Sequence, residues 1–190
     1  MCDKKPLIYG FVITLLALTA CSEKTSTGIE PKTMADALHV VLESNRTVYT
    51  QKIINRLSVK EKILQASEHW EDDRALVLPA QMFRYSAEIA TEKGADFSFS
   101  LLSLWPVNKQ NKPKTQAEKA GLKYIAENPG SVYYGEEVLG NRNYFTAIYP
   151  DTAVATACIE CHNNHRKSPR NDFKIGDVMG GVVIRLPLPD

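Results

Sequence analysis

The sequence predicts an α+β domain in which helices flank an antiparallel sheet. Helical patterns fill most of the first two thirds of the folded part of the chain, strand patterns gather toward its end, and no regular β-α-β alternation connects them. With 190 residues, 44% of them hydrophobic and 24% charged, the chain has an ordinary globular composition. This composition argues against a disordered chain.

Three segments carry helix signals, at residues 34–57, 80–93 and 115–128. In the first, apolar residues recur at helical spacing with charged residues between them, which predicts one long amphipathic helix. Pro79 precedes the second and Gly94 closes it, the usual asymmetry of helix ends. The third starts with the capping-box sequence Thr-Gln-Ala-Glu and ends at Asn-Pro-Gly.

Strand signals occur at residues 97–101, 144–149 and 178–186. The first alternates strictly between apolar and polar residues, and the other two are rich in apolar and β-branched residues. The polar stretch 58–71 continues the first helix with weaker helical character, and residues 106–114, with two prolines, form a loop.

The first twenty residues are predicted to be a signal peptide. Lys4 and Lys5 precede an apolar run over residues 7–18, which at about 1.5 Å per residue is too short to cross a membrane core of about 30 Å. The sequence Leu-Thr-Ala-Cys ending at Cys21 resembles the bacterial lipobox, in which the cysteine is lipidated and becomes the N-terminus. A plain signal peptide cleaved nearby is the alternative.

We therefore divide the chain into a lipoprotein signal peptide (1–20), a flexible tether (21–32) and one domain (33–190). Cleavage removes two lysines and one aspartate, so the net charge falls from +1 to zero. No basic block stands out, so no nucleic-acid partner is expected. We expect a lipoprotein on the periplasmic face of a bacterial membrane, and Ser22 after the cysteine favours the outer membrane over the inner one.

Cys158, Cys161 and His162 form a C-x-x-C-H motif, the attachment sequence of c-type haem. Two thiols three positions apart can reach both vinyl groups of one haem, and the adjacent imidazole can then bind the iron as proximal ligand. A thioredoxin-like C-x-x-C requires a βαβ unit, and a structural zinc site requires a second pair of ligands. Neither pattern is present, and export agrees with covalent haem attachment.

The motif, the following Phe-Lys-Ile-Gly-Asp-Val-Met-Gly-Gly from Phe173 and the strand ending at Leu188 together resemble a family of exported haem c proteins long known only as a domain of unknown function. The stretches 78–84 and 101–106 resemble it too. The resemblance implies a PAS-like fold, one covalent haem c, His162 as proximal ligand, and maturation by the cytochrome c maturation machinery. Members occur alone or as periplasmic modules of chemoreceptors and kinases.

The resemblance leaves the sixth iron ligand open, because members of the family differ there. A distal thiolate is not available unless Cys21 escapes lipidation. Met82 and His39 are the candidate distal ligands from the residues, and each has a plainer alternative. Met82 could simply fill core space, and a lone helical histidine is more often hydrogen-bonded or on the surface.

Two functions remain from the sequence. The first is a haem-based sensor of small gases or of redox state, which fits the resemblance and requires a separate signalling partner, since one domain leaves no room for an output module. The alternative is an electron-transfer cytochrome that passes electrons to periplasmic partners. No acid–base set beside the haem motif predicts an enzyme. Pairing of two copies through the helix at 34–57 is a further expectation.

Overall fold

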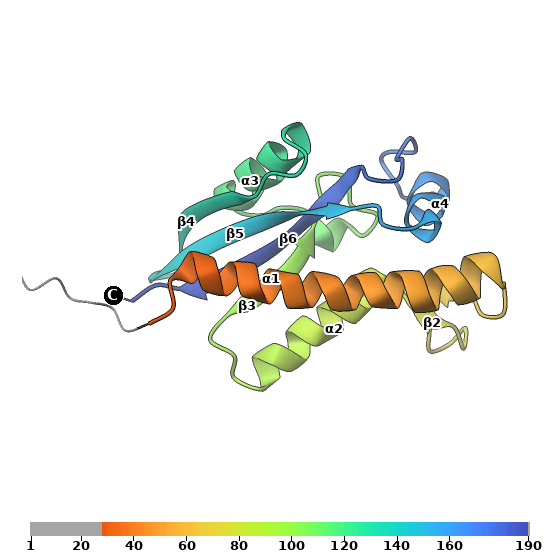
Figure 1. Ribbon diagram of the computed structural model, residues 1–190, viewed down its shortest axis with the longest axis horizontal. Coiled ribbons are helices and arrows are strands. Elements are labelled where there is room, and N and C mark those ends of the chain that lie inside the picture. Colours follow the sequence, from red (N-terminus) through yellow and green to blue (C-terminus); the bar gives the residue numbers. More distant parts are fainter. Residues whose placement is uncertain (1–27, 190) are drawn as a thin grey trace, which may run out of the picture.

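The centre of the fold is an antiparallel sheet of four strands in the order β3–β6–β5–β4 (Figure 1). The computed structural model describes residues 28–189, so the signal peptide, Cys21 and the tether up to residue 27 lie outside the described residues. The strands are β3 (Ser98–Leu102), β4 (Tyr133–Leu139), β5 (Arg142–Thr152) and β6 (Val178–Pro187). The predicted α+β class with an antiparallel sheet is confirmed.

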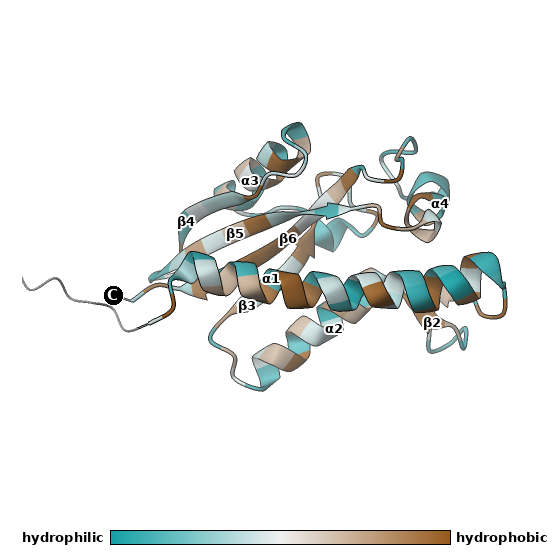
Figure 2. Ribbon diagram, viewed as in Figure 1, coloured by the Kyte–Doolittle hydropathy of each residue, from teal (hydrophilic) through white to brown (hydrophobic). Residues whose placement is uncertain are grey.

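The two central strands, β5 and β6, are covered on both faces. Their register pairs Ala147 with Ile184 and Ile148 with Val183, and all four residues are fully buried. Burial on both faces explains why this part of β6 is a continuous apolar run instead of an alternating one. Figure 2 shows hydrophobic residues concentrated along these strands.

Helices cover the two faces of the sheet. α1 (Pro31–Val48) and α2 (Pro79–Glu92) pack on one face, where Ala35 and Phe83 join a core with Tyr149 of β5. α3 (Gln116–Glu127) packs on the other face, where Leu122 and Ile125 contact the sheet. Figure 1 shows α3 and the α1–α2 pair on opposite sides of the strands.

The predicted long N-terminal helix is present and is longer than expected. α1 begins at Pro31, inside the segment assigned to the tether, because proline is well suited to the first helical position. It continues without a break into η1 (Tyr49–Lys60), where the hydrogen bonding widens to the π-helical i→i+5 pattern. No helix in the described part of the chain is long and apolar enough to cross a membrane.

The helical character predicted for residues 58–71 ends at Lys60. Turns follow, with a two-residue parallel pairing between β1 (Ala66–Ser67) and β2 (Leu76–Val77). The short 3-10 turn η2 (Lys109–Asn111) lies within the predicted 106–114 loop. The segment 61–77 therefore forms an irregular arm beside η1 and α2.

Gly180 and Gly181 in β6 allow close packing within the protein. A Cβ atom at Gly180 would lie 2.5 Å from the backbone oxygen of Leu102 in β3, and one at Gly181 would clash with Leu122 and Ile125 of α3. The two glycines therefore let β6 lie close to β3 and to α3.

Candidate functional site

The residues of the C-x-x-C-H motif lie on α4 (Thr156–Asn164), a short helix at one end of the sheet (Figure 1). This helix was not predicted, because nine residues with little amphipathic contrast give no periodic signal. Both thiols are free; Cys158 is half-buried and Cys161 is exposed. Positions three apart face the same side of a helix, so the two thiols can reach one common ligand.

Side chains of the long N-terminal helix hold the start of α4. The side-chain amide of Gln51 donates to the backbone oxygen of Val154 at 3.2 Å. Asn55 Oδ1 accepts a hydrogen bond from the backbone N–H of Ala157 at 3.3 Å, while the N-cap residue Ala155 offers no side-chain cap. Asn55 thus satisfies, from a distant element, a backbone donor that an N-cap side chain normally satisfies.

A largely buried ion pair joins the same helix to the strand that leads into α4. Arg46 binds the carboxylate of Asp151 with both terminal nitrogens, one of them at 3.0 Å. Their side chains are 12% and 10% exposed. Because Asp151 lies near the end of β5, this bidentate pair fixes the N-terminal helix next to the motif segment.

His162 has one buried ring nitrogen without a partner. Its Nδ1 makes no hydrogen bond to the described residues. Burial is the main cause that lowers the pKa of His162, and Arg46 and His165 lower it further against the opposing charge of Asp151. The imidazole is therefore neutral at neutral pH, the form that binds a metal ion.

Cys161 is an exposed residue, but protein atoms surround much of its thiol group. Burial raises its pKa, and the neighbouring Cys158 and the carboxylate of Glu68 raise it further. Burial and these neighbours disfavour the thiolate, so Cys161 is a protonated thiol at neutral pH. The ion pair of Glu68 with Lys167 places the irregular arm next to the segment that follows α4.

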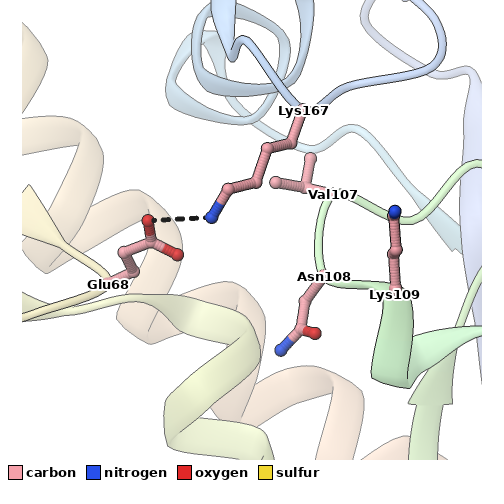
Figure 3. Close-up of a pocket in the computed structure, with 5 residues that line it drawn as sticks. All are labelled: Glu68, Val107, Asn108, Lys109 and Lys167. Atoms are coloured by element: carbon pink, nitrogen blue, oxygen red, sulfur yellow. Dashed lines mark ion pairs between the residues drawn. The ribbon is translucent and has the colours of Figure 1, made fainter.

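An open pocket of about 480 Å³ borders this region, lined by Glu68, Val107, Asn108, Lys109 and Lys167 (Figure 3). Lys167, three residues beyond α4, pairs with Glu68 at 3.5 Å and thereby connects the two walls. The volume lies within the usual range for small-molecule sites, but the lining is more polar than usual.

A small apolar cluster packs against α4. Ala153, Phe173 and Met179 are buried in it, and Trp105, Cys158 and Ile159 pack against it. Met179 is therefore a core residue. The Phe173 ring stands edge-on to the His162 ring, with centroids 6.0 Å apart and an angle of 89° between the planes. Phe173 thus forms one wall of the imidazole site.

The contacts of the two candidate distal ligands are with residues outside α4. His39 stacks flat on Tyr149 of the sheet at 3.9 Å, and its Nε2 is buried with no partner. Met82 lies in the first turn of α2, with its sulfur 3.8 Å from the Ser86 hydroxyl. The residues of the N-terminal helix that reach the motif segment are Arg46, Gln51 and Asn55, so both distal assignments stay predictions.

Sequence reasoning missed most of the residues that surround the motif. Asn55 and the Arg46–Asp151 pair carry no local signal, since their partners lie 102 and 105 residues away in the chain. Asn163 could have been noticed, because it directly follows His162. These residues hold the segment that carries the motif, and haem attachment at the motif stays a prediction.

Comparison with known proteins identifies the family. The model of the Tll0287-like family matches residues 24–187, which is most of the chain. Among solved structures, the cyanobacterial haem protein Tll0287 matches with a TM-score of 0.54 and 14% sequence identity, over 85% of this chain and 98% of that one. No curated protein gives a significant match. The match confirms the predicted membership of a haem-protein family, and the structural likeness shows a shared fold.

Proposed function

The chain belongs to the Tll0287-like family, and we propose that it is a haem protein in which Cys158 and Cys161 hold one haem covalently and His162 binds its iron. One observation carries this proposal: α4 presents two free thiols three residues apart, followed at once by a neutral imidazole. The bound haem would supply an iron centre for ligand binding or electron transfer.

Each residue of the motif has a defined part. The thiols of Cys158 and Cys161 would hold the haem through thioethers, each sulfur bonding one carbon of a vinyl group while the other carbon would take the thiol proton. Protonated, reduced thiols suit this addition, and both described cysteines are free. His162 would bind the iron through its imidazole, and the Phe173 ring lies beside that imidazole at a steep angle.

Other uses of the motif fit the structure less well. β5 does precede α4, as a strand precedes the active-site helix in thioredoxin-like proteins, but the next strand, β6, runs antiparallel to β5, and no βαβ unit is formed. Among the described residues, no group of three or more histidine, cysteine or acidic side chains is placed to hold a metal ion by itself. Haem attachment is the chemistry that uses both cysteines and the histidine together.

We infer that the haem acts as a sensor of small gases or of redox state, with a PAS-like arrangement of sheet and helices. The support is the connection between site and helix: Arg46, Gln51 and Asn55 link the motif segment to the N-terminal helix. A change at the haem would reach a partner protein along this helix. Electron transfer is the second candidate, favoured by the exposure of Cys161, which would leave a haem edge open to a redox partner.

We further propose that the protein is exported and anchored to the periplasmic face of the outer membrane through a lipid on Cys21. This part of the proposal rests on the sequence pattern alone. Export also brings the chain to the compartment in which the cytochrome c maturation machinery attaches haem. Cys21→Ala should release the protein from membranes, and unchanged fractionation would contradict the anchor.

Single-cysteine variants test the haem assignment. The protein is expressed in the periplasm with the maturation machinery, and its haem is converted to the bis-pyridine complex for optical spectroscopy. Cys158→Ala or Cys161→Ala should leave one thioether and shift the visible band toward that of a haem with one free vinyl group. His162→Ala should prevent stable holoprotein. A band of unmodified haem b in the wild-type protein would overturn covalent attachment.

Carbon monoxide distinguishes sensor from carrier. A gas sensor needs an open or displaceable sixth position, so its ferrous spectrum should change when the gas is added. A low-spin ferrous spectrum that carbon monoxide does not change would overturn the gas-sensor proposal and support electron transfer. In that case, Met82→Ala and His39→Ala would test which of the two predicted residues is the second ligand.

A further inference from the structure

Asn163, the residue after His162, is fixed to a segment ten residues farther along the chain. Its side-chain Nδ2 donates to the backbone oxygen of Phe173 at 2.9 Å, and its Oδ1 accepts from the backbone N–H of Phe173 at 3.0 Å. Both polar groups of one side chain thus satisfy both backbone groups of one residue. This pair of hydrogen bonds to the backbone holds the loop 165–172 against the end of α4.

Phe173 is the residue that faces the predicted iron ligand. Its side chain is buried, and the ring stands edge-on to His162 with centroids 6.0 Å apart. On its other sides the ring meets Trp105, with centroids 6.0 Å apart, and the guanidinium of Arg170, 4.3 Å from its centroid. The ring is therefore held by packing, while the backbone that carries it is held by Asn163.

The neighbouring Asn164 provides a comparison within the same turn of helix. It is exposed, and its Nδ2 makes one local hydrogen bond, to the backbone oxygen of Glu160 one turn earlier. The two adjacent asparagines therefore have the same side chain at the same helix end, but Asn163 is partly buried and binds a segment ten residues away, whereas Asn164 is exposed and binds within its own helix.

We propose that Asn163 is a positioning residue for the proximal haem ligand: through its two hydrogen bonds to Phe173, it sets the plane of the His162 imidazole and keeps water from it. This inference rests on the proposed haem function, since His162 must bind iron for the plane to matter there. Both hydrogen bonds join protein groups only, so this latch (Asn163 bound to the backbone of Phe173) and the haem assignment can be tested separately.

The experiment compares wild-type protein with Asn163→Ala and Asn164→Ala. In ferric holoprotein, the haem methyl resonances in the proton NMR spectrum report the orientation of the axial imidazole, and a redox titration gives the reduction potential. Asn163→Ala should change the spread of the methyl shifts and lower the potential, because water near the iron ligand stabilises the ferric state. Asn164→Ala should leave both as in wild type.

Trypsin provides the readout that does not depend on haem. The loop offers exposed cleavage sites after Arg166 and Lys167. Loss of two hydrogen bonds to buried backbone should speed cleavage in Asn163→Ala about tenfold or more relative to Asn164→Ala, with and without haem. Asn163→Asp keeps the acceptor for the Phe173 N–H but loses the donor, so it should give an intermediate rate.

The outcomes separate the two proposals. If wild-type protein carries no haem but Asn163→Ala is cleaved faster, the latch is real and the haem assignment fails. If holoprotein forms but the two alanine variants share the same methyl shifts, potential and cleavage rate, the positioning role of Asn163 is overturned. If only cleavage changes, Asn163 holds the loop without setting the ligand, which also overturns the positioning role.

Discussion

Arg46→Ala should destabilise the protein strongly, because it leaves the Asp151 carboxylate buried without a partner. Breaking one side of a buried ion pair costs about 3–5 kcal/mol. The side chains here are 12% and 10% exposed, so we expect the lower end, about 3 kcal/mol. For a domain of this size, that corresponds to a fall in Tm of about 6–12 °C.

Urea denaturation followed by circular dichroism measures this cost. The matched control is Arg84→Ala, which removes an arginine from an exposed pair with Glu88, whose side chains are 52% and 50% exposed, and should cost at most about 1 kcal/mol. In a double-mutant cycle, Asp151→Ala added to Arg46→Ala should cost less than the sum of the single changes. A loss for Arg46→Ala no larger than that of Arg84→Ala would refute the reasoning.

Three other predictions follow from the structure. Burial alone would raise the pKa of Glu118, but hydrogen bonds from the backbone of Lys114 and Thr115 and from Arg185 outweigh it and lower that pKa. The ionised carboxylate therefore stabilises the fold fully above pH 4.5, the ordinary pKa of the group, and this contribution is lost as the pH falls below that value. Glu118→Gln should flatten the acid limb of a stability–pH curve, and an unchanged curve would contradict this. Gly180→Ala should cost about 1–3 kcal/mol in urea denaturation, because the new Cβ would lie 2.5 Å from a backbone oxygen of β3, and an unchanged free energy of unfolding would show that the close approach has no cost. Asn55→Ala should cost about 1 kcal/mol and speed hydrogen exchange at the first turn of α4, and exchange as slow as in wild type would show that Asn55 does not cap the helix.

Much of the fold could be predicted because its helix ends carry local signals. Pro79 begins α2, and Thr115 caps α3 through a reciprocal capping box with Glu118. These signals depend on neighbours within one turn, so they are visible in the sequence. The central strands were also found, since burial on both faces makes them apolar.

The elements that were missed lack such signals. β4 is an edge strand that contains a glycine and two glutamates, so its composition does not indicate a strand. Its Glu137 points inward and binds Arg185 of β6 at 2.7 Å, together with Glu118 of α3. A charged residue in an inward position breaks the apolar alternation on which strand prediction depends, and only the tertiary partner explains it.

The candidate site also combines a local sequence signal with contacts that have none. The prediction that Cys158, Cys161 and His162 attach haem rests on five consecutive residues, so it could be made without a structure. What holds the motif in place comes from elsewhere: Asn55 and Arg46 lie on a helix more than a hundred residues earlier. Packing between distant elements leaves no pattern in a single sequence, so the sixth ligand could not be assigned from it either.

The most direct test of the account is the intact mass of the protein after maturation in the periplasm, measured after complete denaturation. Covalent attachment at Cys158 and Cys161 predicts that the wild-type protein is heavier by one haem than the variant in which both cysteines are changed to serine, with the lipid on Cys21 common to both. A wild-type chain that loses its haem on denaturation, or a double variant that retains it, would contradict the central claim.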